Sequence, residues 1–199
     1  MMVNEPGRFI DRMNLDSNDI ICVHYESDIH IHRTLEAIKN KGVKAGLALA
    51  KAAGCSGMVA GQVMDLANEG KAVGLDDIRN TDRLKTGELI RVAALLGCIA
   101  AGADDEKIKA AEKYCNNIGL AFQIVDDILD VTGDEKMLGK PIGSDSENEK
   151  STYVSLLGLE KSAEYAEKLT DTAKNALEIF GDEGDFLVQL ADMLASRKN

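Results

Sequence analysis

The spacing of apolar positions changes near residue 48 of this 199-residue chain. Residues 20–24, IICVH, form a β-branched run without polar alternation, which is typical of a strand buried on both faces. A helix-like stretch over residues 30–40 ends at Gly42, and residues 44–49 suit a second strand. The pattern predicts a βαβ-like segment in residues 1–48, too short to bury the apolar surface that independent folding requires.

From Leu49 to the end, the spacing is helical almost throughout. The clearest helix covers residues 105–131, where apolar residues recur at intervals of three and four and form one seam for packing. Further helices are predicted over residues 49–69, 76–101, 151–179 and 184–196, with glycines at the breaks. We therefore expect an all-α protein: a helical bundle over residues 49–199, preceded by the βαβ-like segment of residues 1–48.

Composition narrows the function classes. The chain has 23 Lys and Arg against 34 Asp and Glu, a formal net charge of −11. This balance disfavours general electrostatic binding of nucleic acid, which requires a concentrated basic face. No apolar run approaches the ~20 residues of a membrane span, and the first residues contain no hydrophobic leader. A cytoplasmic protein is the expectation.

The sharpest chemical feature is the acidic end of the helix predicted over residues 105–131. Asp126 and Asp130 lie one turn apart, Asp127 is beside them, and Gln123 precedes them by a turn. Like charges at this spacing repel, and the helix dipole disfavours anions at a C-terminus. A bound cation would compensate, and Mg²⁺ shared with a diphosphate suits clustered carboxylate oxygens. The motif alone is equally compatible with a solvated helix end.

Three lysines near this motif favour the metal hypothesis. Lys140 stands in the loop GKPIG, Lys150 precedes the next helix, and Lys85 lies inside KTGE together with the Thr86 hydroxyl. Each lysine alone is typical of a solvated surface. Together they suit a metal-bridged polyphosphate, because lysine binds phosphate as a point charge.

Five segments, in this order and spacing, resemble the C-terminal half of a polyprenyl (farnesyl or geranyl type) diphosphate synthase: SGMVAGQVMDL, LKTGELIRVAALLG, GLAFQIVDDILDVTGD, LGKPIGSD and EKSTYVSLLGLE. The resemblance covers Leu49 to the end. It implies an all-α fold around a cavity, Mg²⁺ as cofactor, and condensation of isopentenyl diphosphate with an allylic diphosphate, a prenyltransferase reaction of isoprenoid biosynthesis.

The resemblance also implies roles for individual residues. Metal binding would fall to three aspartates, Asp126, Asp127 and Asp130. Substrate binding would fall to Gln62, Asp65, Lys85, Lys140 and Lys150. Stabilisation of the cation left by the departing diphosphate would fall to the catalytic set Lys85, Thr86 and Gln123.

The first aspartate-rich motif of that family is absent from this chain. The acids of residues 76–82, DDIRNTD, imitate its spacing but stand just before KTGE, at the start of a family helix far from the metals. Capping and the helix dipole explain acids at such a position. We therefore expect weak or absent condensation by the chain alone. The alternative is a non-catalytic module that binds diphosphates or pairs with a complementary chain, with oligomers formed through uncovered apolar helix faces.

Two further hypotheses carry less weight. Residues 1–48 resemble an internal fragment of ribulose-phosphate 3-epimerase, but that enzyme's metal ligands would lie outside the fragment. His24, His30 and His32 therefore receive no catalytic role. An EF-hand-type calcium site fails because Asp130 and Asp134 do not follow the alternating pattern of ligands in its loop.

Overall fold

The computed structural model describes residues 7–14, 20–21, 33, 37, 44–45, 51–133 and 150–197. Near the N-terminus these include a short helix, α1 (Gly7–Ile10), and two strands, β1 (Ile20–Ile21) and β2 (Lys44–Ala45). The strands pair in parallel, with Ile20 opposite Lys44 and Ile21 opposite Ala45. They fall at the starts of the two predicted strands. The rest of the predicted βαβ segment lies almost entirely outside the described residues.

The remainder is helical, as predicted. The first helices are α4 (Met58–Asn68), α5 (Leu75–Asp82), the π-helix η2 (Arg83–Gly87), α6 (Glu88–Ala101) and α7 (Asp105–Thr132). They are followed by α10 (Tyr153–Leu157), α11 (Leu159–Ala176), the 3₁₀ helix η3 (Glu178–Gly184) and α12 (Asp185–Ser196). None of the described helices is both long and apolar enough to cross a membrane.

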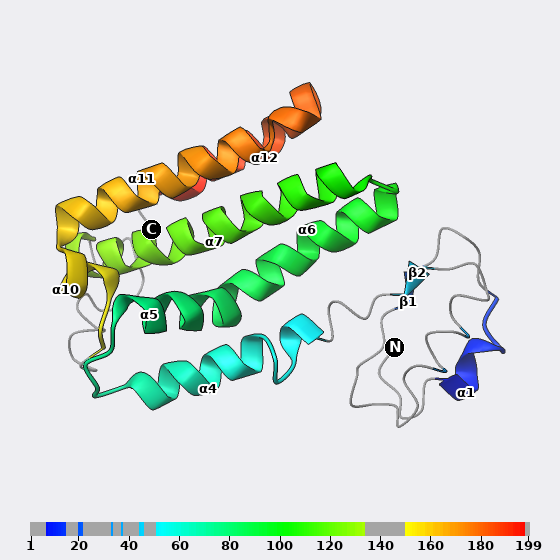
Figure 1. Cartoon of the computed structure of the whole chain (residues 1–199), viewed down its shortest axis with the longest axis horizontal. Coiled ribbons are helices and arrows are strands. Elements are labelled where there is room, and N and C mark those ends of the chain that lie inside the picture. The colour runs from blue at the N-terminus through cyan, green and yellow to red at the C-terminus, as the bar shows by residue number, and fades with distance from the viewer. Residues whose placement is uncertain are drawn as a thin grey trace.

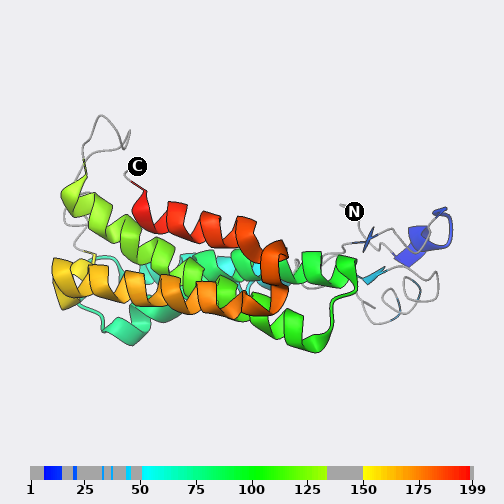
Figure 2. The ribbon, with the colours of Figure 1, turned by 90° about the horizontal axis from the view of Figure 1, so that it is seen from above.

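Helix α7 is the centre of the bundle. It lies between α6 and α11, while α4 forms the outer edge beyond α5 (Figure 1). Seen from above, α12 packs against α7 and α11 from one side (Figure 2). The predicted seam is confirmed, because Ala111, Cys115, Ile118 and Val125 of α7 are all buried.

Two apolar clusters surround this helix. One joins α7 to α11 and α12 through Tyr114, Cys115, Ile118, Ala173, Leu177 and Ala191. The other joins α7 to α5, α10 and α11 through Ile78, Ile124, Val125, Tyr153 and Ala166. Burial of these side chains on both flanks of α7 supplies most of the driving force that orders the bundle.

Two predicted helices are divided in the structure. The helix predicted over residues 151–179 breaks at Gly158, whose φ of +84° only glycine adopts readily, so α10 and α11 are separate. The helix predicted over residues 76–101 changes to π geometry between Arg83 and Gly87. This second change occurs where α4 packs against the chain, and π-turns inside α-helices are frequent at functional sites.

Gly61 permits the close packing of α4 on η2. A Cβ at this position would overlap the backbone nitrogen of Lys85 and lie 2.8 Å from the carbonyl carbon of Leu84. The atoms that would be struck belong to backbone, which cannot rotate aside. The absence of a side chain at Gly61 therefore sets the distance between α4 and the segment that carries Lys85.

We predict that Gly61→Ala lowers the free energy of unfolding by about 1–3 kcal/mol, the usual cost of overpacking. Chemical denaturation followed by circular dichroism measures it. Gly97→Ala is the matched control, because Gly97 is an exposed position of α6 where a Cβ would meet nothing within 4 Å. Helix propensity should make this control neutral or stabilising by about 1 kcal/mol. Equal stability of the two variants would contradict the close approach at Gly61.

Candidate functional site

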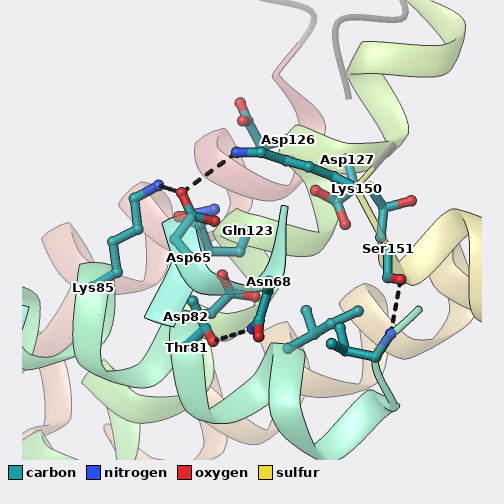
Figure 3. A pocket seen from close by; sticks show the side chains of 13 residues that line it. Asp65, Asn68, Thr81, Asp82, Lys85, Gln123, Asp126, Asp127, Lys150 and Ser151 are labelled. Carbon is teal, nitrogen blue, oxygen red and sulfur yellow. Dashed lines mark hydrogen bonds and ion pairs between the residues drawn. The ribbon is translucent and has the colours of Figure 1, made fainter. Parts of the chain in front are cut away.

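A pocket of about 140 Å³ opens between α4, α5, η2, α7 and the segment that leads into α10 (Figure 3). Most of its lining side chains are charged or polar. The lining residues are Asp65, Asn68, Val73, Ile78, Thr81, Asp82, Lys85, Gln123, Asp126, Asp127, Lys150, Ser151 and Thr152. The pocket therefore collects residues from three separated stretches of the sequence, 65–85, 123–127 and 150–152.

Two lysines converge on Asp65 in this pocket. The Lys85 Nζ lies 2.7 Å from Asp65 Oδ2, and the Lys150 Nζ lies 3.4 Å from the same oxygen (Figure 3). Lys150 also lies 3.5 Å from Oε1 of Glu69. Burial opposes ionisation of Asp65, but the two ammonium groups outweigh it and hold the pKa of this carboxyl below its usual value. Asp65 is an anion held between two cations.

The carboxylates of the acidic helix end point in different directions. Asp126 and Asp127 line the pocket, whereas Asp130 is only 2% exposed and does not reach it. Asp127 Oδ2 accepts a hydrogen bond of 2.8 Å from the backbone N–H of Tyr153, at the start of α10. Asp126 Oδ1 lies 3.3 Å from Nη2 of Arg197.

The expectation that all three aspartates converge is therefore corrected. Helical spacing places Asp126 and Asp130 on one face, but the packing around the end of α7 buries only Asp130. Within the part of the chain that the structure describes, no three His, Cys, Asp or Glu side chains form a group able to hold a metal ion. Mg²⁺ usually takes one or two carboxylates together with substrate phosphates and waters. Asp126 and Asp127 fit that shared type of site, and their role as ligands stays a prediction.

Gln123 and Thr86, which share one predicted role, are joined by a hydrogen bond. The Thr86 hydroxyl donates a hydrogen bond of 2.7 Å to Oε1 of Gln123, which lines the pocket. Thr86 itself does not line it, so this residue orients the Gln123 amide from behind. Oε1 has two lone pairs, so after accepting this bond it keeps acceptor capacity, and the amide N–H₂ can donate to a neighbouring acceptor.

Two predicted substrate-binding residues are not found at the pocket. Gln62 is exposed on α4 and does not line the pocket, although it stands only three residues before Asp65, which does. Lys140 lies outside the described residues. The remaining predicted lining residues, Asp65, Lys85 and Lys150, are all present.

Asp82 is a pocket residue that sequence reasoning assigned elsewhere. The helix-start interpretation suits Asp76, which is exposed, and Asp77, whose Oδ2 accepts a hydrogen bond from Gly74 N. It is wrong for Asp82, which is largely buried at the pocket. The signal was available: Asp82 precedes Lys85 by three residues and therefore shares its helix face.

The environment of Asp82 favours its protonated form. Burial raises the pKa of this carboxyl to about 6, and the neighbouring charges of Asp65 and Asp126 add to the effect. The Tyr153 hydroxyl and Lys85 offset part of this rise. The hydroxyl is buried close to Asp82, although no hydrogen bond of normal geometry joins it to any described residue. Below about pH 6, a proton on Asp82 therefore reduces the negative charge at the pocket.

Comparison with known proteins gives a consistent result. A family model described as polyprenyl synthetase matches residues 25–180. The heterodimeric geranylgeranyl pyrophosphate synthase large subunit 1 of Arabidopsis thaliana is 45% identical over 161 residues, 79% of this chain and 43% of the relative. The farnesyl diphosphate synthase of Escherichia coli is 44% identical over 153 residues, 75% and 51% of the two chains.

A solved structure agrees with the sequence matches. The polyprenyl synthase of Caulobacter crescentus, complexed with calcium and isoprenyl diphosphate, superposes with a TM-score of 0.73 at 26% identity. The superposition covers 84% of this chain and 63% of that one. The chain spans about half the length of the curated relatives that it matches.

The family match begins at residue 25, so it includes part of residues 1–48. The predicted boundary near Leu49 and the epimerase resemblance stay predictions.

The raised pKa of Asp82 can be tested by the pH dependence of the free energy of unfolding. Its folded pKa of about 6 exceeds the usual 3.8, so the folded state binds the proton more tightly. The free energy of unfolding should therefore fall as pH rises from about 4 to about 6 in metal-free protein, and then level. Denaturation of Asp82→Asn across this range should lack that component. Asp76→Asn, at an exposed position of the same helix, should keep it. A carboxyl resonance of Asp82 that titrates near pH 4 would contradict the assignment.

Proposed function

Because the chain belongs to the polyprenyl synthetase family, we propose that its pocket binds the diphosphate of an isoprenoid substrate between two lysines and a magnesium ion held by the acidic end of α7. The observation that carries this proposal is the arrangement of opposite charges around one small space. Lys85 and Lys150 meet at Asp65, and the carboxylates of Asp126 and Asp127 line the same pocket (Figure 3).

The lysines supply the direct contact with the phosphate oxygens. Their ammonium groups already share one carboxylate oxygen in the absence of a ligand, so they are positioned to share an anionic oxygen of a diphosphate. The incoming anion replaces or joins Asp65, whose charge keeps the two cations together until then. Lys140 is proposed to add a further contact on the resemblance of its GKPIG segment alone.

Asp126 and Asp127 hold the metal that this family typically requires. Mg²⁺ stabilises the negative charge that develops on the departing diphosphate. The carbonyl oxygen of Gln123, which keeps a second lone pair beside its hydrogen bond from Thr86, is proposed to stabilise the allylic cation.

The finer proposal is that the chain by itself binds an allylic diphosphate but condenses it weakly or not at all. Its sequence contains only the second of the two aspartate-rich motifs. A single metal half-site neutralises only part of the diphosphate charge, so the leaving group is poorly stabilised. This proposal separates binding, which the described pocket supports, from turnover.

Calorimetric titration with geranyl diphosphate and Mg²⁺ tests the proposal. We expect binding that Lys85→Ala weakens about 10- to 100-fold, the range of a charge-assisted hydrogen bond. Arg83→Ala is the matched control, since it removes one positive charge from the same π-helix at an exposed side chain that does not line the pocket. Adding isopentenyl diphosphate should give little or no farnesyl product. Equal losses in both variants, or robust turnover, would contradict the proposal.

The second candidate function is assembly with a complementary chain, and α4 carries the observation that favours it. Its outward face exposes Val59, Val63 and Leu66, which are 44%, 59% and 58% exposed. Their spacing of four and three residues places them on one stripe. Large apolar side chains in such a stripe usually mark a surface that another polypeptide covers.

We expect the chain to associate through this stripe in solution. Light scattering coupled to size-exclusion chromatography should show a mass above 21.4 kDa that rises with concentration. Val63→Lys should reduce the association. Glu164→Gln is the control, since it makes the same change of one charge at an exposed position of α11. A well-folded monomer at all concentrations would contradict the assembly function without affecting diphosphate binding.

A further inference from the structure

Arg197, the first residue after α12, reaches across to α7. Its Nη2 donates a hydrogen bond of 3.0 Å to the carbonyl of Phe122 and lies 3.3 Å from Asp126 Oδ1. Its guanidinium also stacks on the Phe122 ring, 3.7 Å from the centroid. A residue near the C-terminus thus contacts one of the two carboxylates proposed to hold the metal, 71 residues earlier in the chain.

The three contacts differ in strength. The 3.3 Å separation from Asp126 is longer than the 2.7–2.9 Å typical of a charge-assisted hydrogen bond. The stacking and the bond to the Phe122 carbonyl remain if the guanidinium leaves Asp126. The Nε of Arg197 is buried and has no hydrogen-bond partner among the described residues. The side chain is therefore anchored to Phe122, and its contact with Asp126 is the weakest of the three.

We propose that Arg197 is an internal counter-ion for Asp126, which a divalent metal ion must displace when it binds. Asp126 is 43% exposed, so a hydrated ion can approach it, whereas Arg197 is only 16% exposed. A doubly charged ion attracts the carboxylate more strongly than a guanidinium at 3.3 Å does. Displacement removes one of the three contacts that hold Arg197, so metal binding at the pocket loosens the attachment of this residue to α7.

The sign of one measurement distinguishes this role from simple support of Asp126. A counter-ion competes with the metal, so its removal tightens metal binding. A residue that merely orients Asp126 would assist the metal, and its removal would weaken binding. The inference rests on the proposed metal role of Asp126, and the experiment therefore includes a variant of that aspartate.

The experiment is a titration with Mn²⁺, a carboxylate-binding substitute for Mg²⁺, followed by electron paramagnetic resonance of the free ion. We expect Arg197→Ala to tighten Mn²⁺ binding about threefold to tenfold, as suits loss of a partly exposed ion pair. Lys174→Ala is the control. It removes one positive charge and a 2.8 Å contact to Asp192 of α12, but leaves Asp126 untouched. In an Asp126→Asn background the effect of Arg197→Ala should vanish.

Trypsin supplies a second readout in the unmutated chain. Cleavage between Arg197 and Lys198 requires the Arg197 side chain to leave both Phe122 and Asp126. Because bound Mn²⁺ would already have removed the contact with Asp126, it should accelerate loss of the last two residues, measured by mass spectrometry. Asp126→Asn should show no effect of the metal. If Arg197→Ala fails to fold, this readout tests whether metal binding displaces Arg197 from Asp126.

The outcomes separate the two proposals. Mn²⁺ binding that is absent, or unaffected by Asp126→Asn, overturns the proposed metal site. Mn²⁺ binding that depends on Asp126 but is unchanged or weakened in Arg197→Ala overturns the proposed counter-ion role of Arg197. Tryptic cleavage that Mn²⁺ leaves unchanged or slows overturns it as well. Tighter binding in Arg197→Ala but not in Lys174→Ala supports it.

Discussion

The pocket depends on the close contact between α4 and the π-helix η2. Gly61 lets the two backbones meet, and one turn later Asp65 forms its 2.7 Å ion pair with Lys85. Packing and electrostatics thus reinforce each other: the glycine brings the carboxylate within reach, and the ion pair holds the lysine toward the pocket. Lys150 joins the same carboxylate from the segment before α10. Without this contact, the lysines and the acidic end of α7 would not share one space.

The charges at the pocket are balanced from within the chain. Asp65 neutralises the lysines, Arg197 contacts Asp126, and the raised pKa of Asp82 favours a neutral carboxyl. Each arrangement reduces the cost of collecting charges in a partly desolvated place. This balance is consistent with the proposed anion site in a chain of net charge −11, because the local potential depends on the two nearby lysines more than on the total charge.

The two sides of the bundle differ in how completely they are covered. Helix α7 buries apolar residues toward both α11 and α5, which makes it the most thoroughly packed element. Helix α4 packs inward on η2 but exposes a stripe of valine and leucine outward. The proposed half-site and the proposed assembly surface therefore lie on opposite faces of one helix.

Much of the fold and of the pocket followed from local patterns. The seam of α7 was readable because its apolar spacing persists along a 28-residue helix. The family resemblance, more than any single motif, singled out Lys85, Gln123 and Asp126. The break at Gly158 was missed because the sequence around it is helical on both sides, and only the φ of the glycine reveals the turn.

The sequence by itself determined the helical class, the family resemblance and the inventory of charged groups, since these depend on residue type and spacing along the chain. Only the tertiary structure decided which groups meet. It buried Asp130 while leaving Asp126 at the pocket, brought Asp82 to the site, turned Gln62 outward and placed Arg197 on Asp126. Helical periodicity states which face a residue occupies. The burial and the partner of that face depend on distant elements that pack over it, and these appear nowhere in the local pattern.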